Sequence, residues 1–203
     1  MNRKNELASI STQLLSFFES VLRLKSVKRA GWVSKVGIAN PESVSDHTYS
    51  MCAIGMILSD MLGLDTDRVT KMIILHDLDE SLIGDYIPGE ITKEKKRFEE
   101  RKAMNCILYQ MPVTVRSNYK RIWLEYQANK TQVAKFVHKL DKLEMAMQAR
   151  QYINEGYSSE TLIQFFSSAR RSIGRYKTAQ DDPPSGDIVL EILNTLEKSI
   201  MRQ

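Results

Sequence analysis

An apolar run near the middle of the chain ends abruptly in a histidine and three acids: Ile73-Ile74-Leu75-His76-Asp77-Leu78-Asp79-Glu80. Apolar side chains usually form the core, and charged side chains rarely enter it unless they are paired or bound to a metal. Residues three or four positions apart share a helix face, so His76 and Glu80 are expected to point the same way. Taken alone, the pattern fits either a histidine packed at a helix end beside an acid or part of a metal site.

A second histidine lies on an apolar helix face earlier in the chain. Two helix starts are open there: Pro41 in the first turn with Asn40 or Ser43 as cap, or Ser43 as cap with Asp46 completing a capping box. In both cases the buried face runs at steps of four, three, four and three, which places the histidine inward: His47, Met51, Ile54, Leu58 and Met61.

A third polar position interrupts the long apolar helix predicted for residues 131–152. Asp141 stands one turn from apolar residues on either side, where a carboxylate is costly unless it is paired or coordinated. The alternatives are an ion pair with Lys139 or Lys142, an exposed position, or a metal ligand. His138, one turn earlier, is either a rival ligand or a surface residue. Two imidazoles and two carboxylates would suit a borderline or hard divalent metal.

Composition and periodicity predict an all-α protein. The 203 residues are 42% hydrophobic and 27% charged, with only nine glycines and five prolines, which is few for an all-β fold with many turns. We expect a single helical domain over residues 1–178. A polar linker and a C-terminal helix, packed on the same domain, are expected for 179–203. Apolar periodicity predicts helices near 7–25, 43–62, 66–76, 92–111, 115–129, 131–152, 159–173 and 188–200, and a loop over 26–40 with Trp32 in the core.

Charge and cysteine content narrow the function. A net charge of +4, from 29 basic and 25 acidic residues spread along the chain, is too small and diffuse for duplex binding but suits a small phosphorylated substrate. No signal segment and no apolar run of about 18 residues occurs, so no membrane association is expected. Cys52 and Cys106 lack metal-site spacing and are expected to be buried free thiols in a reducing cytoplasm.

Taken together, these motifs resemble the HD-domain metal-dependent phosphohydrolases, and among them the helical HD-domain 5′-deoxynucleotidases. The resemblance covers roughly Leu14 to Glu155. It rests on the order and spacing of Arg29-Ala30-Gly31-Trp32, Pro41-Glu42-Ser43-Val44-Ser45-Asp46-His47, His76-Asp77-Leu78-Asp79-Glu80, Gly84-Asp85 with Pro88, and Lys139-Leu140-Asp141-Lys142.

The resemblance implies a compact helical HD fold and a role for each matching residue. One divalent metal ion (Mn, Co, Zn, Ni, Fe or Mg) and a nucleoside 5′-monophosphate substrate are implied, together with a homodimer. Two alternatives stay open: another HD phosphohydrolase acting on phosphodiesters or polyphosphorylated nucleotides, and a non-catalytic nucleotide-binding protein. The implied metal ligands are His47, His76, Asp77 and Asp141, the catalytic acids Glu80 and Asp85, the phosphate contact Arg29, and the wall against the sugar Trp32.

Overall fold

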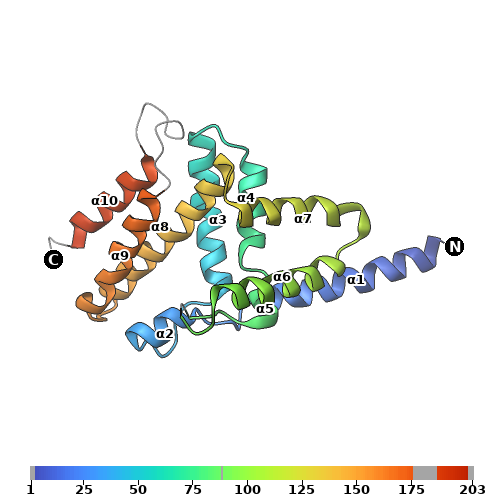
Figure 1. The fold of residues 1–203 in the computed structure, drawn as a ribbon, viewed down its shortest axis with the longest axis horizontal. Helices are drawn as coiled ribbons and strands as arrows, with labels where there is room; N and C mark the ends of the chain where they lie inside the picture. Colours follow the sequence, from blue (N-terminus) through green and yellow to red (C-terminus); the bar gives the residue numbers. More distant parts are fainter. Residues whose placement is uncertain (1–2, 88, 176–186, 201–203) are drawn as a thin grey trace. The chain divides into compact units, whose positions relative to one another are not determined.

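The computed structural model describes residues 3–87, 89–175 and 187–200. Within these ranges every regular element is a helix, apart from one isolated bridge between Lys28 and Ser43, so the all-α prediction is confirmed. The helices, labelled in Figure 1, are α1 (Arg3–Arg23), α2 (Ala30–Val36), α3 (Val44–Met61), α4 (Thr66–His76), α5 (Glu80–Ile83), α6 (Lys93–Tyr109), α7 (Val113–Ala128), α8 (Gln132–Asn154), α9 (Ser159–Gly174) and α10 (Ile188–Ile200).

No helix in the described part of the chain has the length and apolar character needed to span a membrane.

The chain divides into two compact units. The first contains the described residues of Met1–Tyr49 and Lys71–Glu125, and the second contains those of Ser50–Thr70 and Tyr126–Gln203. Helices α3, α4 and α7 therefore contribute residues to both units. The expected end of the main domain at residue 178 falls within 176–186, outside the described residues, and stays a prediction.

The first unit buries one side of the apolar run around the acidic stretch, whereas Ile74 is 44% exposed. Ile73, Leu75 and Leu78 are at most 2% exposed. The short α5 follows directly and packs against α1 and α6. Helix α4 thus ends at His76 and the chain turns before α5 begins at Glu80, so Asp77, Asp79 and Glu80 lie in the same unit as the histidine.

A capping box starts α3, which decides between the two predicted starts. The Ser43 N–H donates to Asp46 Oδ2 at 2.9 Å, and the Asp46 N–H donates to Ser43 Oγ at 3.1 Å. These reciprocal bonds satisfy backbone donors that the first helical turn would leave open. They also set the register that turns His47, with no exposed surface, toward the interior.

The expected loop over 26–40 is wrong in its middle, because α2 forms there. Gly31, interpreted as a turn residue from the sequence, lies inside the first turn of α2. The helix instead ends at Gly37, whose φ of 76° lies in the left-handed region that glycine adopts readily. Seven residues are too few for apolar periodicity to reveal a helix. The expected burial of Trp32 is confirmed, at 2% exposure.

The thiols are free, but neither is fully buried as expected. Cys52 is half-buried on α3, whereas Cys106 is exposed on α6. The prediction was wrong for Cys106 because the apolar residues around it lie on the opposite side of α6, where Met104, Ile107 and Leu108 are buried.

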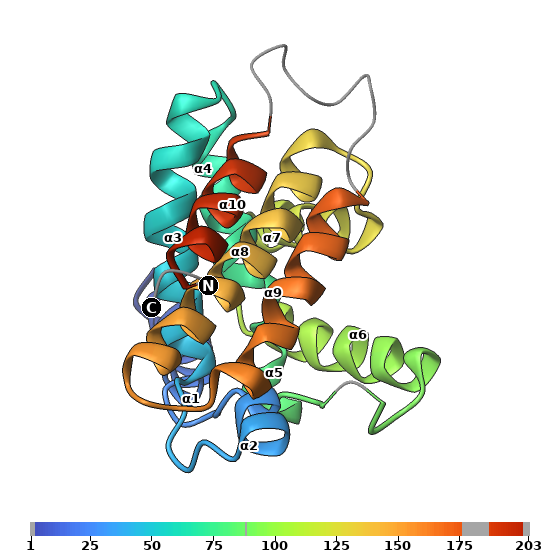
Figure 2. The same cartoon turned by 90° about the vertical axis from the view of Figure 1, so that its left-hand side faces the viewer.

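The second unit is built on α8, with α9 and α10 packed against it (Figure 2). Thr131 caps α8, because its hydroxyl accepts a hydrogen bond from the Ala134 N–H at 3.2 Å. The interior consists of small and branched residues with at most 1% exposure, including Val137, Leu140, Leu143, Ala146, Leu162 and Leu193.

A buried ion pair fixes the start of α10. The ammonium of Lys139 on α8 donates to Asp187 Oδ2 at 2.9 Å, and both residues are at most 9% exposed. Asp187 also caps α10 through Oδ1, which accepts from the backbone N–H groups of Val189 at 3.1 Å and Leu190 at 3.3 Å. The sequence placed Asp187 in the polar linker; it is instead an anchor for the last helix.

We predict that Asp187→Ala lowers the free energy of unfolding by about 3 kcal/mol, because it removes the carboxylate opposite a buried ammonium. Urea unfolding followed by circular dichroism measures the loss. The control is Glu197→Ala, also on α10, which breaks a more exposed ion pair with Arg170 of α9. This variant should cost less than about 1 kcal/mol. Equal losses from the two variants would contradict the anchoring role of Asp187.

Candidate functional site

The two inward histidines meet within the first unit. His47 lies in the first turn of α3 and His76 is the last residue of α4; their ring centroids are 5.5 Å apart and both are at most 3% exposed. His76 Nδ1 lies 2.6 Å from the carbonyl oxygen of Ile73, which can only accept. Nδ1 therefore carries a proton, so Nε2 is the ring nitrogen that the neutral form of His76 offers to a metal.

Asp77 completes a cluster of donor atoms with the two histidines. Its Oδ2 lies 3.0 Å from His76 Nε2, and one ligand atom from each of His47, His76 and Asp77 falls within 4.8 Å of the other two. Burial opposes ionisation of Asp77, but the neighbouring His76, with Arg29 and His47, lowers its pKa far below the usual range. Asp77 is thus anionic at neutral pH.

The donor set fits a divalent cation. Two imidazoles and an ionised carboxylate, converging from one unit, form the mixed nitrogen and oxygen set that Zn, Co, Ni, Fe and Mn accept. The Nδ1 bond of His76 to Ile73 is the outer contact that commonly fixes the tautomer and orientation of a ligating imidazole.

Glu80 lies beside this cluster in a buried position. It is 7% exposed, and its Oε2 has no hydrogen-bond partner among the described residues. Burial, followed by the negative charges of Asp77 and Asp85, raises the pKa of Glu80 to about 11, although Arg29 acts in the opposite direction. Two carboxyl groups three residues apart are therefore pushed to opposite protonation states, a pattern typical of acid–base sites.

Asp85 and Arg29 border the same cluster. Arg29 Nη1 donates to Asp77 Oδ2 at 3.3 Å, and the Asp85 Oδ2 accepts from the Ala30 N–H at 2.8 Å. Burial raises the pKa of Asp85, while Arg29 and the Ala30 N–H partly offset this effect. The structure thus brings Arg29, Asp77, Glu80 and Asp85 into one electrostatic network.

Trp32 lies on α2, three residues after Arg29. Its indole N–H donates to Glu42 Oε1 at 2.9 Å. The predicted role of this ring as a wall against a sugar is not tested by these contacts.

Asp141 and His138 lie on α8 in the second unit. Asp141 is 8% exposed, and its Oδ2 lies 2.9 Å from Lys142 Nζ, so one of the alternatives left open by the sequence, an ion pair with Lys142, is present. The role of Asp141 as fourth ligand stays a prediction. His138 is neither a surface residue nor oriented as an open ligand: its Nε2 lies 3.1 Å from the Tyr126 carbonyl and its ring stacks on Tyr126 with centroids 4.1 Å apart.

Sequence reasoning overlooked two acids in the first unit. Burial, followed by the charges of Asp77 and Glu100, raises the pKa of Asp79 well above its usual value. Glu42 was quoted within a motif but given no role, although its side chain holds Trp32. An acid directly after a proline carries no periodic signal of such a contact. Pro88, also quoted in a motif, lies outside the described residues.

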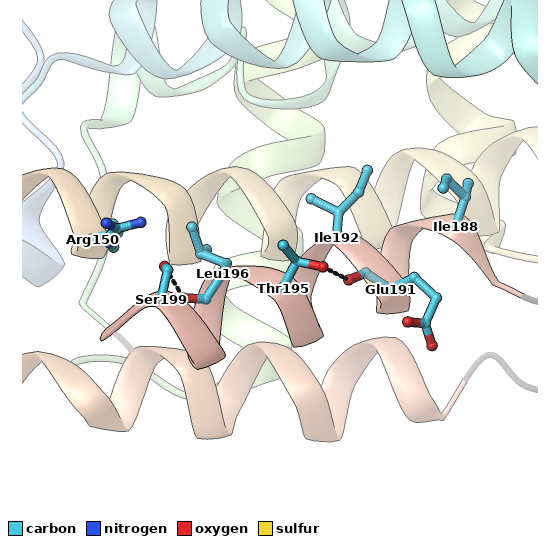
Figure 3. A pocket seen from close by; sticks show the side chains of 7 residues that line it. All are labelled: Arg150, Ile188, Glu191, Ile192, Thr195, Leu196 and Ser199. Atoms are coloured by element: carbon cyan, nitrogen blue, oxygen red, sulfur yellow. Dashed lines mark hydrogen bonds between the residues drawn. The ribbon is translucent and has the colours of Figure 1, made fainter. Parts of the chain in front are cut away.

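A separate groove of about 380 Å³ lies in the second unit, where α10 faces Arg150 of α8 (Figure 3). Its walls are mostly apolar, with Ile188, Ile192 and Leu196 along α10. None of the predicted metal-binding, catalytic or substrate-binding residues lines it, so we assign it no role in the candidate site.

Comparisons with known proteins agree with the resemblance seen in the motifs. The sequence model of the HD domain matches residues 21–179. The chain is 37% identical over 156 residues to the 5′-deoxynucleotidase HDDC2 of Homo sapiens, covering 76% of each chain. It is 39% identical over 167 residues to the 5′-deoxynucleotidase HDDC2 of Dictyostelium discoideum, covering 77% of this chain and 87% of that one.

A solved structure shows the same fold. A conserved hypothetical protein from Pyrococcus furiosus superposes with a TM-score of 0.72 at 26% identity, over 91% of this chain and 99% of that one. The sequence and structure comparisons therefore confirm both the family resemblance and the helical fold that it implied.

The raised pKa of Glu80 predicts a pH-dependent stability in metal-free protein. The unfolded chain releases this proton near the usual pKa of 4.5, whereas the folded chain keeps it until about pH 11. The stabilisation is complete below pH 4.5 and is lost as the pH rises toward 11, at no more than about 1.4 kcal/mol per pH unit. With chelator present, Glu80→Gln should therefore raise the melting temperature more at pH 8 than at pH 5.

The control is Glu19→Gln, which neutralises an exposed carboxylate on α1 and should give the same small difference at both pH values. A Glu80→Gln effect that did not grow with pH would show that Glu80 is already ionised in the metal-free protein.

Proposed function

Because this chain belongs to the HD-domain family, we propose that it is a metal-dependent phosphomonoesterase that hydrolyses deoxynucleoside 5′-monophosphates to nucleoside and phosphate. The cluster of His47, His76 and Asp77, with Glu80 buried beside it, carries this proposal. Relatives named 5′-deoxynucleotidases over three quarters of the chain support the choice of substrate.

His47, His76, Asp77 and Asp141 are the proposed ligands of one divalent ion. When bound, the ion supplies positive charge that polarises the phosphoryl group, favours deprotonation of water and favours the ionised form of the surrounding carboxyls. The choice among Mn, Co, Zn, Ni, Fe and Mg is not fixed by this donor set.

The side chains around the ligands supply substrate binding and proton transfer. Arg29, already beside Asp77, binds the phosphate and neutralises charge where it develops in the transition state. Glu80 takes a proton from the attacking water, whose oxygen forms the new bond to phosphorus. As the bond from phosphorus to the 5′ oxygen breaks, Asp85 supplies the proton for that oxygen from Oδ1, since its Oδ2 accepts from Ala30. Trp32 borders the sugar.

The two rival functions explain fewer of these contacts. Hydrolysis of phosphodiesters or polyphosphorylated nucleotides within this fold generally calls for further histidine ligands, and the chain has three histidines, of which His138 is occupied with Tyr126. A non-catalytic nucleotide-binding protein that kept the metal for stability would not need the buried Glu80 or the raised pKa of Asp85.

A homodimer in the cytoplasm completes the proposal. Helix α1 exposes Leu7, Leu15, Phe18 and Leu22 by more than half of each side chain, an apolar surface suited to a second copy. Sedimentation equilibrium should give twice the chain mass of 23.3 kDa, and Phe18→Glu should shift it toward the single-chain mass. A single-chain mass for the wild type would contradict the dimer. The free thiols of Cys52 and Cys106 fit a reducing compartment.

The direct test is phosphate release from a panel of ribo- and deoxynucleotides with several divalent metals. We expect turnover of 5′-monophosphates that chelation removes and metal restores. His76→Ala and Asp77→Ala should abolish turnover. Glu80→Gln should reduce kcat by about 10²- to 10⁴-fold, the usual contribution of a general base, with metal content unchanged.

Full turnover in His76→Ala would contradict the proposed mechanism. Chelation that lowered the melting temperature without affecting turnover would favour a structural metal. Turnover restricted to phosphodiesters or polyphosphorylated nucleotides would favour the other HD chemistries.

A further inference from the structure

The segment from Arg29 to Trp32 is held by two carboxylate side chains. Asp85 accepts from the Ala30 N–H at 2.8 Å, and Glu42 accepts from the indole N–H of Trp32 at 2.9 Å. Glu42 makes a second contact through its backbone, because its carbonyl accepts from the Arg29 N–H at 3.1 Å. One residue, Glu42, therefore touches both ends of the segment.

The backbone around Glu42 is itself well fixed. Lys28 and Ser43 form an antiparallel bridge, and the Val44 N–H donates to the Val27 carbonyl at 2.9 Å. The ammonium of Lys28 donates to the Pro41 carbonyl at 3.1 Å. These contacts join the chain before Arg29 to the chain that enters α3, so Glu42 cannot shift without moving both.

Glu42 also lies next to a proposed metal ligand. One of its carboxylate oxygens is within 4.8 Å of a ring nitrogen of His47, five residues later at the start of α3. Glu42 thus lies between the substrate-binding segment, residues 29–32, and the cluster of proposed metal ligands. It contacts Trp32 and is close to His47.

The burial of Trp32 makes its orientation sensitive to Glu42. At 2% exposure, the indole can border a substrate only along an edge. A buried indole N–H that loses its acceptor carries a free-energy penalty, which favours a new orientation of the ring. Arg29 is tied to the same residue, because its backbone N–H donates to the Glu42 carbonyl.

We propose that Glu42 is a positioning residue for the substrate-binding segment: its carboxylate fixes the indole of Trp32, its carbonyl fixes Arg29, and together they set the geometry of phosphate and sugar binding. This inference rests on the proposed phosphomonoesterase function. The role belongs to substrate binding rather than to bond breaking, so it should affect KM more than kcat.

The test compares Glu42→Leu, which removes the acceptor, with Glu42→Gln, which keeps an amide oxygen for the indole. We expect Glu42→Leu to raise KM for a deoxynucleoside 5′-monophosphate about tenfold, the equivalent of one lost hydrogen bond, with a smaller change in kcat. Glu42→Gln should recover most of the loss. Metal content, measured by atomic absorption, should stay equal to that of the wild type in both variants.

A spectroscopic readout makes the inference independent of turnover. The chain has two tryptophans, so Trp123→Phe leaves Trp32 as the single emitter. In that background Glu42→Leu should shift the emission of Trp32, whereas Glu42→Gln and the exposed-site control Glu19→Leu should not.

A double-mutant cycle covers the case in which Glu42→Leu folds poorly. Trp32→Phe keeps an aromatic ring at this position but removes the N–H, so adding Glu42→Gln or Glu42→Leu to it should cost less than in the wild type. Additive effects on KM, or an unchanged Trp32 emission in Glu42→Leu, would overturn the inference. Absence of monophosphate turnover in the wild type would instead refute the proposed function. The emission measurement would still show whether Glu42 holds the indole of Trp32.

Discussion

The burial of His47 and His76 beside the half-buried Asp77 is the constraint on which the rest of the site depends. Two nearly inaccessible imidazoles and an anionic carboxylate are costly inside a helical core unless charge or coordination compensates them. Arg29 supplies part of that compensation, and a divalent cation would supply the remainder. Two helix ends form this cluster. A capping box at the start of α3 sets the register of His47, and His76 and Asp77 lie side by side at the end of α4.

The same cluster sets the protonation of its neighbours. Asp77 keeps its charge because His76, Arg29 and His47 surround it. Burial raises the pKa of Glu80 and Asp85, and the charge of Asp77 adds to that effect. Without a cation the raised pKa keeps Glu80 protonated, and a bound cation would favour the ionised form of the surrounding carboxyls. Metal binding, acid–base chemistry and stability are therefore linked through a few charges rather than through separate parts of the fold.

Much of this arrangement was predictable from local patterns. Steps of three and four placed His47 and His76 on buried faces. The expectation that His76 and Glu80 share a helix face is wrong, because α4 ends at His76 and α5 begins at Glu80, although the charge of Asp77 still acts on Glu80. Contacts between residues distant in sequence were not predictable in this way. The pairing of Lys139 with Asp187 and of Trp32 with Glu42 depends on how separate segments pack, which no periodicity records. The short α2 was missed for a different reason, because Gly31 resembled a terminator while Gly37 is the actual one.

Anomalous diffraction from crystals grown with Mn or Co tests the proposed metal site directly, because it locates the ion among the side chains. We predict one ion bound by His76 Nε2, a ring nitrogen of His47, a carboxylate oxygen of Asp77 and a carboxylate oxygen of Asp141, at about 2.0–2.3 Å. An ion bound elsewhere, in protein that still releases phosphate from nucleoside 5′-monophosphates, would contradict it.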